Sequence, residues 1–260
     1  MVGARPNYMK MAPIVRAFAR HDPPLPGLLV HTGQHYDADM NDRLFADLRL
    51  PRPDINLEVG SATHAVQTAE IMRRFEPVVD THQPSCVLVV GDVNSTLARG
   101  LVAVKKHVPL VHVEAGLRSF DRRMPEEINR VLTDQISDLL FTTERLAHEN
   151  LAREGIDPER VRFAGNVMID SLLANLPHAV APGETLRKGG VAGDVLNEPA
   201  GRGVVTLHRP SNVDHPEALG PLLGVLREAS ERLPLVFAMH PRTARNIERF
   251  GFRGELESAR

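Results

Sequence analysis

The sequence has few cysteines and few aromatic residues, and neither sign of charge dominates it. Its 260 residues include one cysteine, no tryptophan and two tyrosines, and the formal net charge is -2. A disulfide framework within the chain is therefore excluded, which suits a reducing cytoplasm. The charge gives no support for binding to nucleic acid or to an acidic membrane surface. No apolar run has membrane-spanning length, and the start lacks a secretory pattern, so we expect a cytoplasmic globular protein.

Continuous apolar runs alternate with stretches of helical period along the sequence. In one such run, Cys86-Val87-Leu88-Val89-Val90, we expect Cys86 to be a buried small hydrophobic residue rather than a nucleophile. Runs that are apolar at every position indicate strands covered on both faces. Strands are expected at 27–32, 86–90, 109–113, 139–142, 204–207 and 235–239, and helices at 38–47, 63–82, 95–106, 126–137, 144–153 and 216–232. This order predicts an α/β fold with parallel sheets.

A change of pattern near residue 166 divides the sequence into two regions. Residues 1–165 form the first, and 166–260 hold a helix at 166–173 that could link two lobes, a segment at 177–202 rich in Gly, Pro and Ala, and two further strands. Two strands are too few for a stable open parallel sheet, and residues 1–3 are too short for the strand expected before the first loop. We therefore expect a sequence truncated at both ends, with the second lobe incomplete.

Polar residues follow five of the predicted strands, at the edge where open parallel sheets bind their ligands. These strand ends read Gly33-Gln34-His35, Gly91-Asp92, Glu114-Ala115-Gly116, His208-Arg209-Pro210 and His240-Pro241-Arg242. Each one alone is weak evidence, because helix N-caps also favour Asp, Asn and Ser. Together they predict a ligand-binding edge.

Asp92 and Glu114 are the main candidates for acid–base chemistry at this edge. Asp92 could also be an ordinary turn residue, although Ser95 is the better cap for the helix that follows. Glu114 precedes two small residues, Ala115 and Gly116, which leave room for a ligand. Local pattern alone leaves both interpretations open.

The stretch HVEAGLRSFDRRMPEEINR at 112–130 is dense in charge. Glu126 and Arg130 lie four residues apart on one helix face, so a surface ion pair explains them as well as a functional site does. Arg118 could hold the loop or contact a phosphate. The remaining charges, interpreted as solvated, are Asp121, Arg122 and Arg123.

The first loop, at residues 3–10, places Arg5 and Lys10 in front of a helix. Pro13 fits an early helical turn, so we expect this helix to start near Met11. Loop amides, a helix N-terminus and two cations together suit an anion such as a phosphate. ATP-binding, dinucleotide-binding and zinc-binding spacings do not occur in the sequence, so ATP hydrolysis, nicotinamide redox chemistry and metal dependence lack their usual signatures.

Taken together, these motifs resemble the non-hydrolysing UDP-N-acetylglucosamine 2-epimerases. The matching stretches are GARPNYMKMAPI, HTGQHYDADM, VVGDVNSTLA, HVEAGLRSFDRRMPEEINR, AGNVMIDSL and TLHRPSNVD, in the family's order over almost the whole sequence. The resemblance implies two Rossmann-like lobes of the glycosyltransferase-B type: residues 1–165 with the first strand largely missing, and 166–260 as a linker helix with a partial second domain. It also implies substrate in the cleft between the lobes, a homodimer, and no need for a metal or a nicotinamide cofactor.

The family interconverts UDP-N-acetylglucosamine and UDP-N-acetylmannosamine by inverting C2 of the sugar. UDP is eliminated to give 2-acetamidoglucal and then added back with protonation on the other face, which requires carboxylates as acid and base and cations on the diphosphate. The resemblance implies that the catalytic residues are Asp92, Glu114, Glu126 and His208, and that the substrate-binding residues are Arg5, Lys10, Arg130 and His240. Within it, Asp92 and Glu114 form the acid–base pair. The product would supply N-acetylmannosamine for cell-surface polysaccharide.

Two departures from the family pattern leave other functions open. Gln34 and His35 match a segment that binds a regulatory UDP-N-acetylglucosamine, but Asp37 stands where the family has a second glutamine. The family's Asp-Ser-Gly-Gly loop, which holds UDP, does not occur in the sequence. A hydrolysing epimerase that releases N-acetylmannosamine and UDP, and a non-catalytic nucleotide-sugar-binding fragment, therefore stay as alternatives.

Overall fold

The computed structural model describes residues 5–33, 44–191 and 201–257. The chain forms two compact units, Met1–His178 and Ala179–Arg260. No helix in the described ranges is long and apolar enough to cross a membrane.

The first unit is built on parallel strands. Its four-stranded sheet has the order β3 (Val87–Val90), β4 (Leu110–Ala115), β5 (Leu139–Thr142) and β6 (Val161–Phe163), and a separate pair joins β1 (Val30–His31) to β2 (Ile55–Asn56). Every pairing is parallel. The predicted α/β fold with parallel sheets is confirmed.

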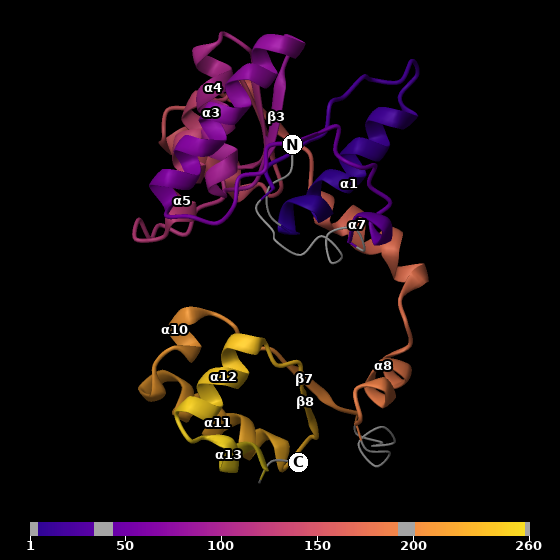
Figure 1. Ribbon diagram of the computed structural model, residues 1–260, viewed down its shortest axis with the longest axis vertical. Coiled ribbons are helices and arrows are strands. Elements are labelled where there is room, and N and C mark those ends of the chain that lie inside the picture. The colour runs from indigo at the N-terminus through magenta and orange to yellow at the C-terminus, as the bar shows by residue number, and fades with distance from the viewer. Residues whose placement is uncertain (1–4, 34–43, 192–200, 258–260) are drawn as a thin grey trace. The chain divides into compact units, whose positions relative to one another are not determined.

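Helices cover both faces of the four-stranded sheet. On one side lie α3 (His64–His82), α4 (Asn94–Lys105) and α5 (Pro125–Ile136), and on the other lie α1 (Arg5–Arg20) and α7 (Val167–Asn175) (Figure 1). A further helix, α6 (Leu146–Arg153), contributes Leu151 to a cluster with Leu140 of β5. Parallel strands require helical connections of this kind, because the chain must cross back over the sheet between one strand and the next.

Alternating side chains of β3 explain why its run is apolar at every position. Val87 and Val89 belong to the core cluster that includes Phe75 of α3 and Val102 of α4. Val90 belongs to the opposite cluster, which includes Tyr8 of α1. Because successive side chains of a strand point to opposite faces, a sheet covered on both sides needs no polar alternation.

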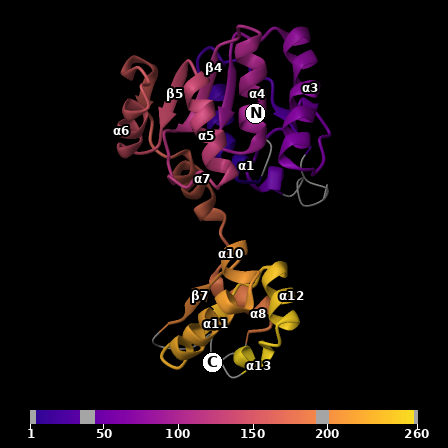
Figure 2. The same ribbon diagram turned by 90° about the vertical axis from the view of Figure 1, so that its left-hand side faces the viewer.

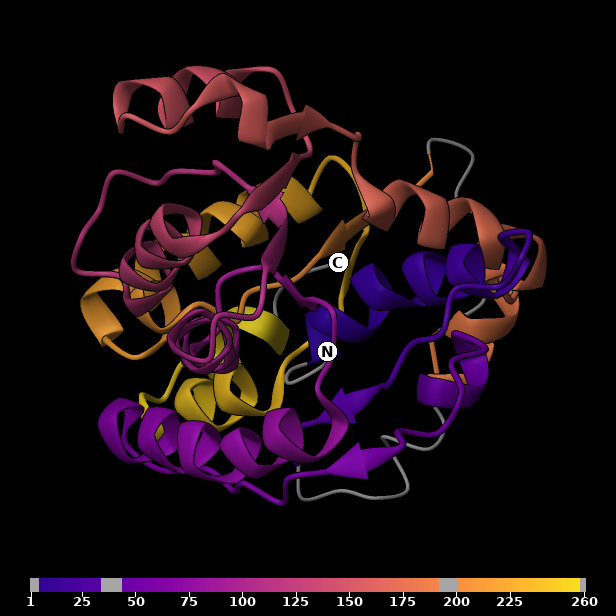
Figure 3. The same cartoon turned by 90° about the horizontal axis from the view of Figure 1, so that it is seen from above.

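Helix α1 starts at Arg5, well before the position near Met11 that was predicted from Pro13. A proline within a helix has no N–H to donate, so the carbonyl four residues earlier loses its partner. Here that carbonyl belongs to Met9, and the Ser171 hydroxyl of α7 donates to it. The two helices lie side by side (Figure 3), so tertiary packing satisfies the acceptor that the proline leaves free.

Other differences concern element ends. Cys86 is exposed rather than buried, because β3 begins at the next residue. The predicted strand 27–32 forms only over Val30–His31, and residues 38–43 of the predicted helix 38–47 lie outside the described residues. The strands β2 and β6 were missed because two or three residues are too short to show a period.

The second unit contains two parallel strands, β7 (Gly203–Val205) and β8 (Leu235–Phe237). Its helices in the described residues are α8 (Pro182–Lys188), α10 (Pro210–Val213), α11 (Pro216–Ser230), α12 (Pro241–Arg249) and α13 (Arg253–Glu257), and the last four gather beside these strands (Figure 2). Its core cluster is Val213, Leu219, Leu223 and Ile247. Helix α8 forms inside the segment 177–202, and α7 belongs by its contacts to the first unit. The domain boundary at 165/166 stays a prediction.

Candidate functional site

The end of β3 carries the first of the two predicted acid–base carboxylates. Gly91 follows the strand with a φ of 70°, and Asp92 comes next. Arg130 of α5 donates from Nη2 to Asp92 Oδ2 at 2.5 Å, and Asn129 donates from Nδ2 to the Asp92 carbonyl at 2.9 Å. Asp92 is therefore held by α5 and does not cap α4.

The predicted cap of α4 was wrong. Val93 is the N-cap residue and makes no side-chain cap bond. Ser95 is buried inside the helix, where its carbonyl and hydroxyl both accept hydrogen bonds from Arg99. Asp92 stays free of a capping role, although for a different reason from the one expected.

The end of β4 carries the second carboxylate. The strand register shifts between Val113 and Ala115, so Glu114 is the extra residue of a bulge, and its φ of 71° lies in the left-handed region. Bulges of this kind redirect a side chain and are frequent at functional sites. Lys10 of α1 donates from Nζ to Glu114 Oε1 at 2.5 Å.

Gly91 lies against this second ion pair. A Cβ atom added there would stand 3.1 Å from Lys10 Nζ and 4.0 Å from Glu114 Oε1. The positive φ favours glycine at this position, and a side chain there would also press on the end of Lys10. The ends of β3 and β4 are thus adjacent, as expected for neighbouring parallel strands.

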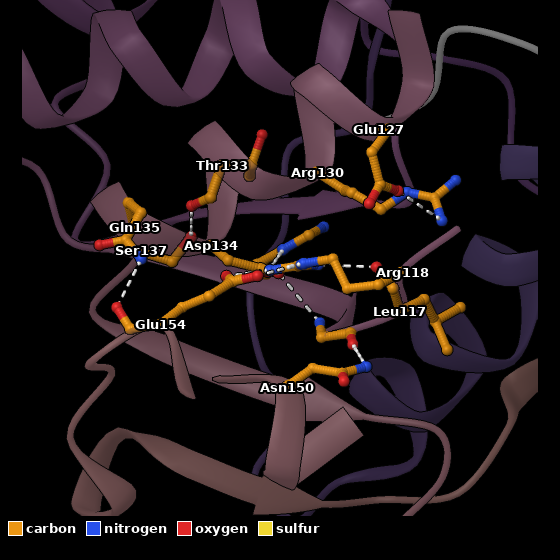
Figure 4. A network of polar contacts seen from close by, with 12 residues as sticks. Leu117, Arg118, Glu127, Arg130, Thr133, Asp134, Gln135, Ser137, Asn150 and Glu154 are labelled. Carbon is orange, nitrogen blue, oxygen red and sulfur yellow. Dashed lines mark hydrogen bonds and ion pairs between the residues drawn. The ribbon is translucent and has the colours of Figure 1, made fainter. Parts of the chain in front are cut away.

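A buried polar network lies behind these strand ends (Figure 4). Asp134 of α5 is fully buried and pairs through Oδ2 with Arg118 Nη2 at 2.7 Å. Arg118 also binds Glu154 through two hydrogen bonds, at 2.6 and 2.7 Å. Burial by itself would raise the pKa of Asp134, but His112 and Arg118 hold the pKa of that carboxyl below its ordinary value. Arg118 therefore holds the loop, one of the two roles considered for it.

The buried glutamate at the start of α5 is Glu127. Its carboxylate accepts hydrogen bonds from the Ser119 amide at 2.9 Å, the Ser119 hydroxyl at 3.0 Å and the Phe120 amide at 3.0 Å. Burial opposes ionisation, but these donors and Arg130 keep the pKa of Glu127 below its ordinary value. Glu127 therefore anchors the loop that follows β4.

Glu126 is half-buried, and Arg130 does not pair with it. Within the described residues, Arg130 pairs with Asp92 and, at 3.5 Å, with Glu127. The ion pair between positions 126 and 130, considered as the ordinary explanation of these residues, does not form. The catalytic role of Glu126 stays a prediction.

The second unit brings the two predicted histidines together after β7 and β8. The ring centroids of His208 and His240 are 6.3 Å apart, and both residues are exposed. His240 is the N-cap of α12, where its Nδ1 accepts from the Arg242 amide at 3.1 Å. Arg242 in turn forms a bidentate pair with Asp214, at 2.6 and 2.7 Å.

Three predicted residues lie wholly or partly outside what the structure describes. Arg5 begins α1, but its side chain is not among the described ones, and neither are Gln34 and His35. In the described part of the chain, no group of three or more His, Cys, Asp or Glu residues is arranged to hold a metal ion.

Four polar residues of this site were not singled out from the sequence: His112, Glu127, Asn129 and Asp134. The sequence signal that could have identified such residues is a polar residue at a position where the local pattern predicts burial. His112 stands between Val111 and Val113 in a strand, and Asp134 follows one helical turn after Arg130. Neither residue lies at the end of a strand, where the sequence prediction placed the site.

Comparisons with known proteins agree with the fold. The sequence profile of UDP-N-acetylglucosamine 2-epimerase matches residues 19–258. A relative with that name from Methanocaldococcus jannaschii is 40% identical over 260 residues, 99% of this chain and 69% of the relative. UDP-2,3-diacetamido-2,3-dideoxy-D-glucuronate 2-epimerase of Pseudomonas aeruginosa is also 40% identical, over 99% of this chain and 70% of that relative.

A solved structure extends the likeness to three dimensions. The crystal structure of M. jannaschii UDP-GlcNAc 2-epimerase in complex with UDP-GlcNAc and UDP matches with a TM-score of 0.82 and 38% identity, over 98% of this chain and 69% of that one. The fold class is thus that of Rossmann-like units of the glycosyltransferase-B type. The chain belongs to the UDP-N-acetylglucosamine 2-epimerase family.

Proposed function

We propose that the protein interconverts UDP-N-acetylglucosamine and UDP-N-acetylmannosamine by inverting C2 of the sugar, without hydrolysis. The observation that carries this proposal is the pair of adjacent strand ends. Each delivers one carboxylate, Asp92 or Glu114, and each carboxylate is bound at 2.5 Å by a cation from a neighbouring helix. Family membership supplies the substrate class, and the paired carboxylates supply the acid–base chemistry.

Epimerisation at C2 needs a route other than direct deprotonation, because C2 is not next to a carbonyl. In the proposed reaction a base removes the C2 proton while the bond from C1 to the UDP oxygen breaks. The C2–H electron pair forms the C1=C2 bond of 2-acetamidoglucal, and the C1–O pair leaves with UDP. Addition of the UDP oxygen to C1, with protonation of C2 on the opposite face, completes the inversion.

We assign the acid and base roles to Asp92 and Glu114. Their partners Arg130 and Lys10 keep both carboxylates in a fixed orientation and can interact with the substrate when it binds. Glu126, half-buried next to Glu127, adjusts the charge state of the pair. The proposed diphosphate-binding residues, which stabilise the charge that develops on UDP, are Arg5, His208 and His240.

A second substrate has a specific observation in its favour. The Pseudomonas aeruginosa relative, named for UDP-2,3-diacetamido-2,3-dideoxy-D-glucuronate, is as similar to this chain as the M. jannaschii one. Both names describe inversion at C2 of a UDP sugar, so the carboxylate chemistry is the same for either. Comparing kcat/KM for the two sugars decides the substrate.

Incubation of the protein with UDP-N-acetylglucosamine in D2O tests the mechanism. We expect deuterium at C2 and a mixture of the two UDP sugars. Release of free N-acetylmannosamine with stoichiometric UDP would instead identify a hydrolysing enzyme. Protein that binds either UDP sugar without C2 exchange would be a non-catalytic binder.

The two carboxylates are tested by Asp92→Asn and Glu114→Gln. Each should lower the rate of C2 exchange by several orders of magnitude while circular dichroism stays unchanged, because a neutral amide cannot transfer the proton. Near-normal exchange in either variant would remove that residue from the mechanism.

We also propose that the protein works in the cytoplasm as a homodimer and supplies N-acetylmannosamine for cell-surface polysaccharide.

A further inference from the structure

His112 is a fully buried histidine whose two ring nitrogens both face hydrogen-bond acceptors. Nε2 lies 2.9 Å from the carbonyl oxygen of Gly91, and Nδ1 lies 2.6 Å from Oδ1 of Asp134. A backbone carbonyl can only accept, so Nε2 is the donor to Gly91.

Asp134 has two further partners. Its second oxygen, Oδ2, accepts from the Gly116 amide at 3.0 Å and pairs with Arg118 at 2.7 Å. Asp134 therefore binds the Gly116 amide and Arg118 through one oxygen and the His112 ring through the other, so the imidazole links the Gly91 carbonyl to the carboxylate that holds Gly116.

The backbone groups that this pair holds belong to the two predicted catalytic strand ends. Gly91 immediately precedes Asp92, and its φ is 70°. Gly116 follows Glu114 by two residues, and its φ is 79°. Glu114 itself adopts a φ of 71°, which a non-glycine residue keeps only when its surroundings enforce it.

We propose that the His112–Asp134 pair positions Asp92 and Glu114 for catalysis by holding the Gly91 carbonyl and the Gly116 amide in one buried unit. Neither member touches the reacting carboxylates, so both are positioning residues. The inference deepens the proposed function and rests on it. A misplacement of about 1 Å, caused far from the reacting atoms, can lower a rate about 100-fold.

Two conservative substitutions each remove one half of the connection. In His112→Gln the longer amide can still donate to the Gly91 carbonyl but no longer binds Asp134. In His112→Asn the shorter amide can still donate to Asp134 but does not reach Gly91. We expect each variant to lower kcat for C2 exchange about 100-fold. The KM of the UDP sugar should change less than about threefold, since His112 contacts no substrate.

A matched control weakens the same network from its outer side. Glu154→Gln removes the negative charge that pairs with Arg118, and residue 154 is hydrogen-bonded to neither Gly91 nor Gly116. We expect it to lower the melting temperature about as much as the His112 variants do, with kcat within about twofold of the unaltered protein. A kcat in Glu154→Gln as low as in the His112 variants would overturn the proposal, because loss of stability alone would then explain the effect.

Combination with Glu114→Gln separates positioning from a general structural role. If His112 acts through the catalytic carboxylates, adding His112→Gln to Glu114→Gln should lower the residual rate less than about threefold, since residues that act as a unit are non-additive. A further 100-fold loss would contradict the proposal. Failure of both single His112 variants to fold would also contradict it, because the pair would then be a requirement for folding.

Backbone amide exchange gives a readout that does not depend on activity. Both His112 variants should speed deuterium uptake in segments 91–94 and 114–119, and Glu154→Gln should not. If the unaltered protein shows no C2 exchange with any UDP sugar, the proposed function fails. The amide measurement still decides whether the His112–Asp134 pair holds the strand ends; unchanged uptake would overturn that.

Discussion

Two buried arginines of the first unit stand in opposite electrostatic surroundings. The Arg118 side chain, 1% exposed, is paired with the two carboxylates of Asp134 and Glu154. Arg99 of α4 is fully buried, yet its guanidinium binds only the carbonyl and hydroxyl of Ser95, and its Nη1 has no hydrogen-bond partner among the described residues.

The pKa values of the two groups follow these surroundings. Burial would lower the pKa of Arg118, but Glu154 and Asp134 raise it above its ordinary value. Arg99 has no such carboxylate, and burial lowers its pKa to about 9. The two pKa values differ because the surroundings of Arg118 supply opposite charge and those of Arg99 do not.

Removing the paired arginine should have the largest effect on stability. Arg118→Met leaves Asp134 buried with less compensation, so we expect a loss of about 3 to 5 kcal/mol in the free energy of unfolding. Urea denaturation followed by circular dichroism measures it. A loss below about 1 kcal/mol would mean that the network contributes little to stability, and it would contradict the proposed difference between Arg118 and Arg99.

The unpaired arginine should behave in the opposite way. Arg99→Met keeps the length of the aliphatic stem and removes a donor that has no partner, so we expect a gain of about 1 to 3 kcal/mol in the same measurement. Arg99→Lys is the matched control, because it keeps the buried charge and should give no gain. Destabilisation by Arg99→Met would show that Arg99 has a partner that the described residues do not include.

Alkaline pH offers a second readout of Arg99. Above pH 9 the folded guanidinium loses its proton while the unfolded one, with an ordinary value of 12.5, keeps it. The unfolded state then binds more protons, so this group makes the free energy of unfolding rise with pH between about 9 and 12.5. This rise in the free energy of unfolding should be present in the unaltered protein and absent from Arg99→Met, so the difference between the two pH profiles is the contribution of Arg99.

The smallest effect is expected at the surface. Arg123 lowers the pKa of Asp121 to about 2 through hydrogen bonds, but the Arg123 side chain is 91% exposed. Solvent screens such a pair, so Asp121→Asn should leave the urea midpoint unchanged within error. A measurable loss would show that the loop after β4 depends on this pair as well as on Glu127.

Much of the architecture follows from local pattern. The apolar runs at 86–90 and 109–113 indicated parallel strands covered on both faces, and β3 and β4 form there. Motif order indicated the family, and polar strand ends indicated Asp92 and Glu114. Helix ends were harder, because the start of α1 depends on Ser171, which lies 162 residues from the carbonyl it satisfies.

The sequence by itself determined the fold class, the family and the strand ends that carry the candidate chemistry, because periodicity and motif spacing are local properties. Tertiary structure decided which charges meet. Lys10 binds Glu114 across 104 residues, and Arg130 binds Asp92 across 38. It also decided that Glu127 rather than Glu126 is buried, and that Arg118 is paired while Arg99 is not. The free energy of a charged side chain in the folded protein depends on its burial and on the distance to its partner, and the local sequence determines neither.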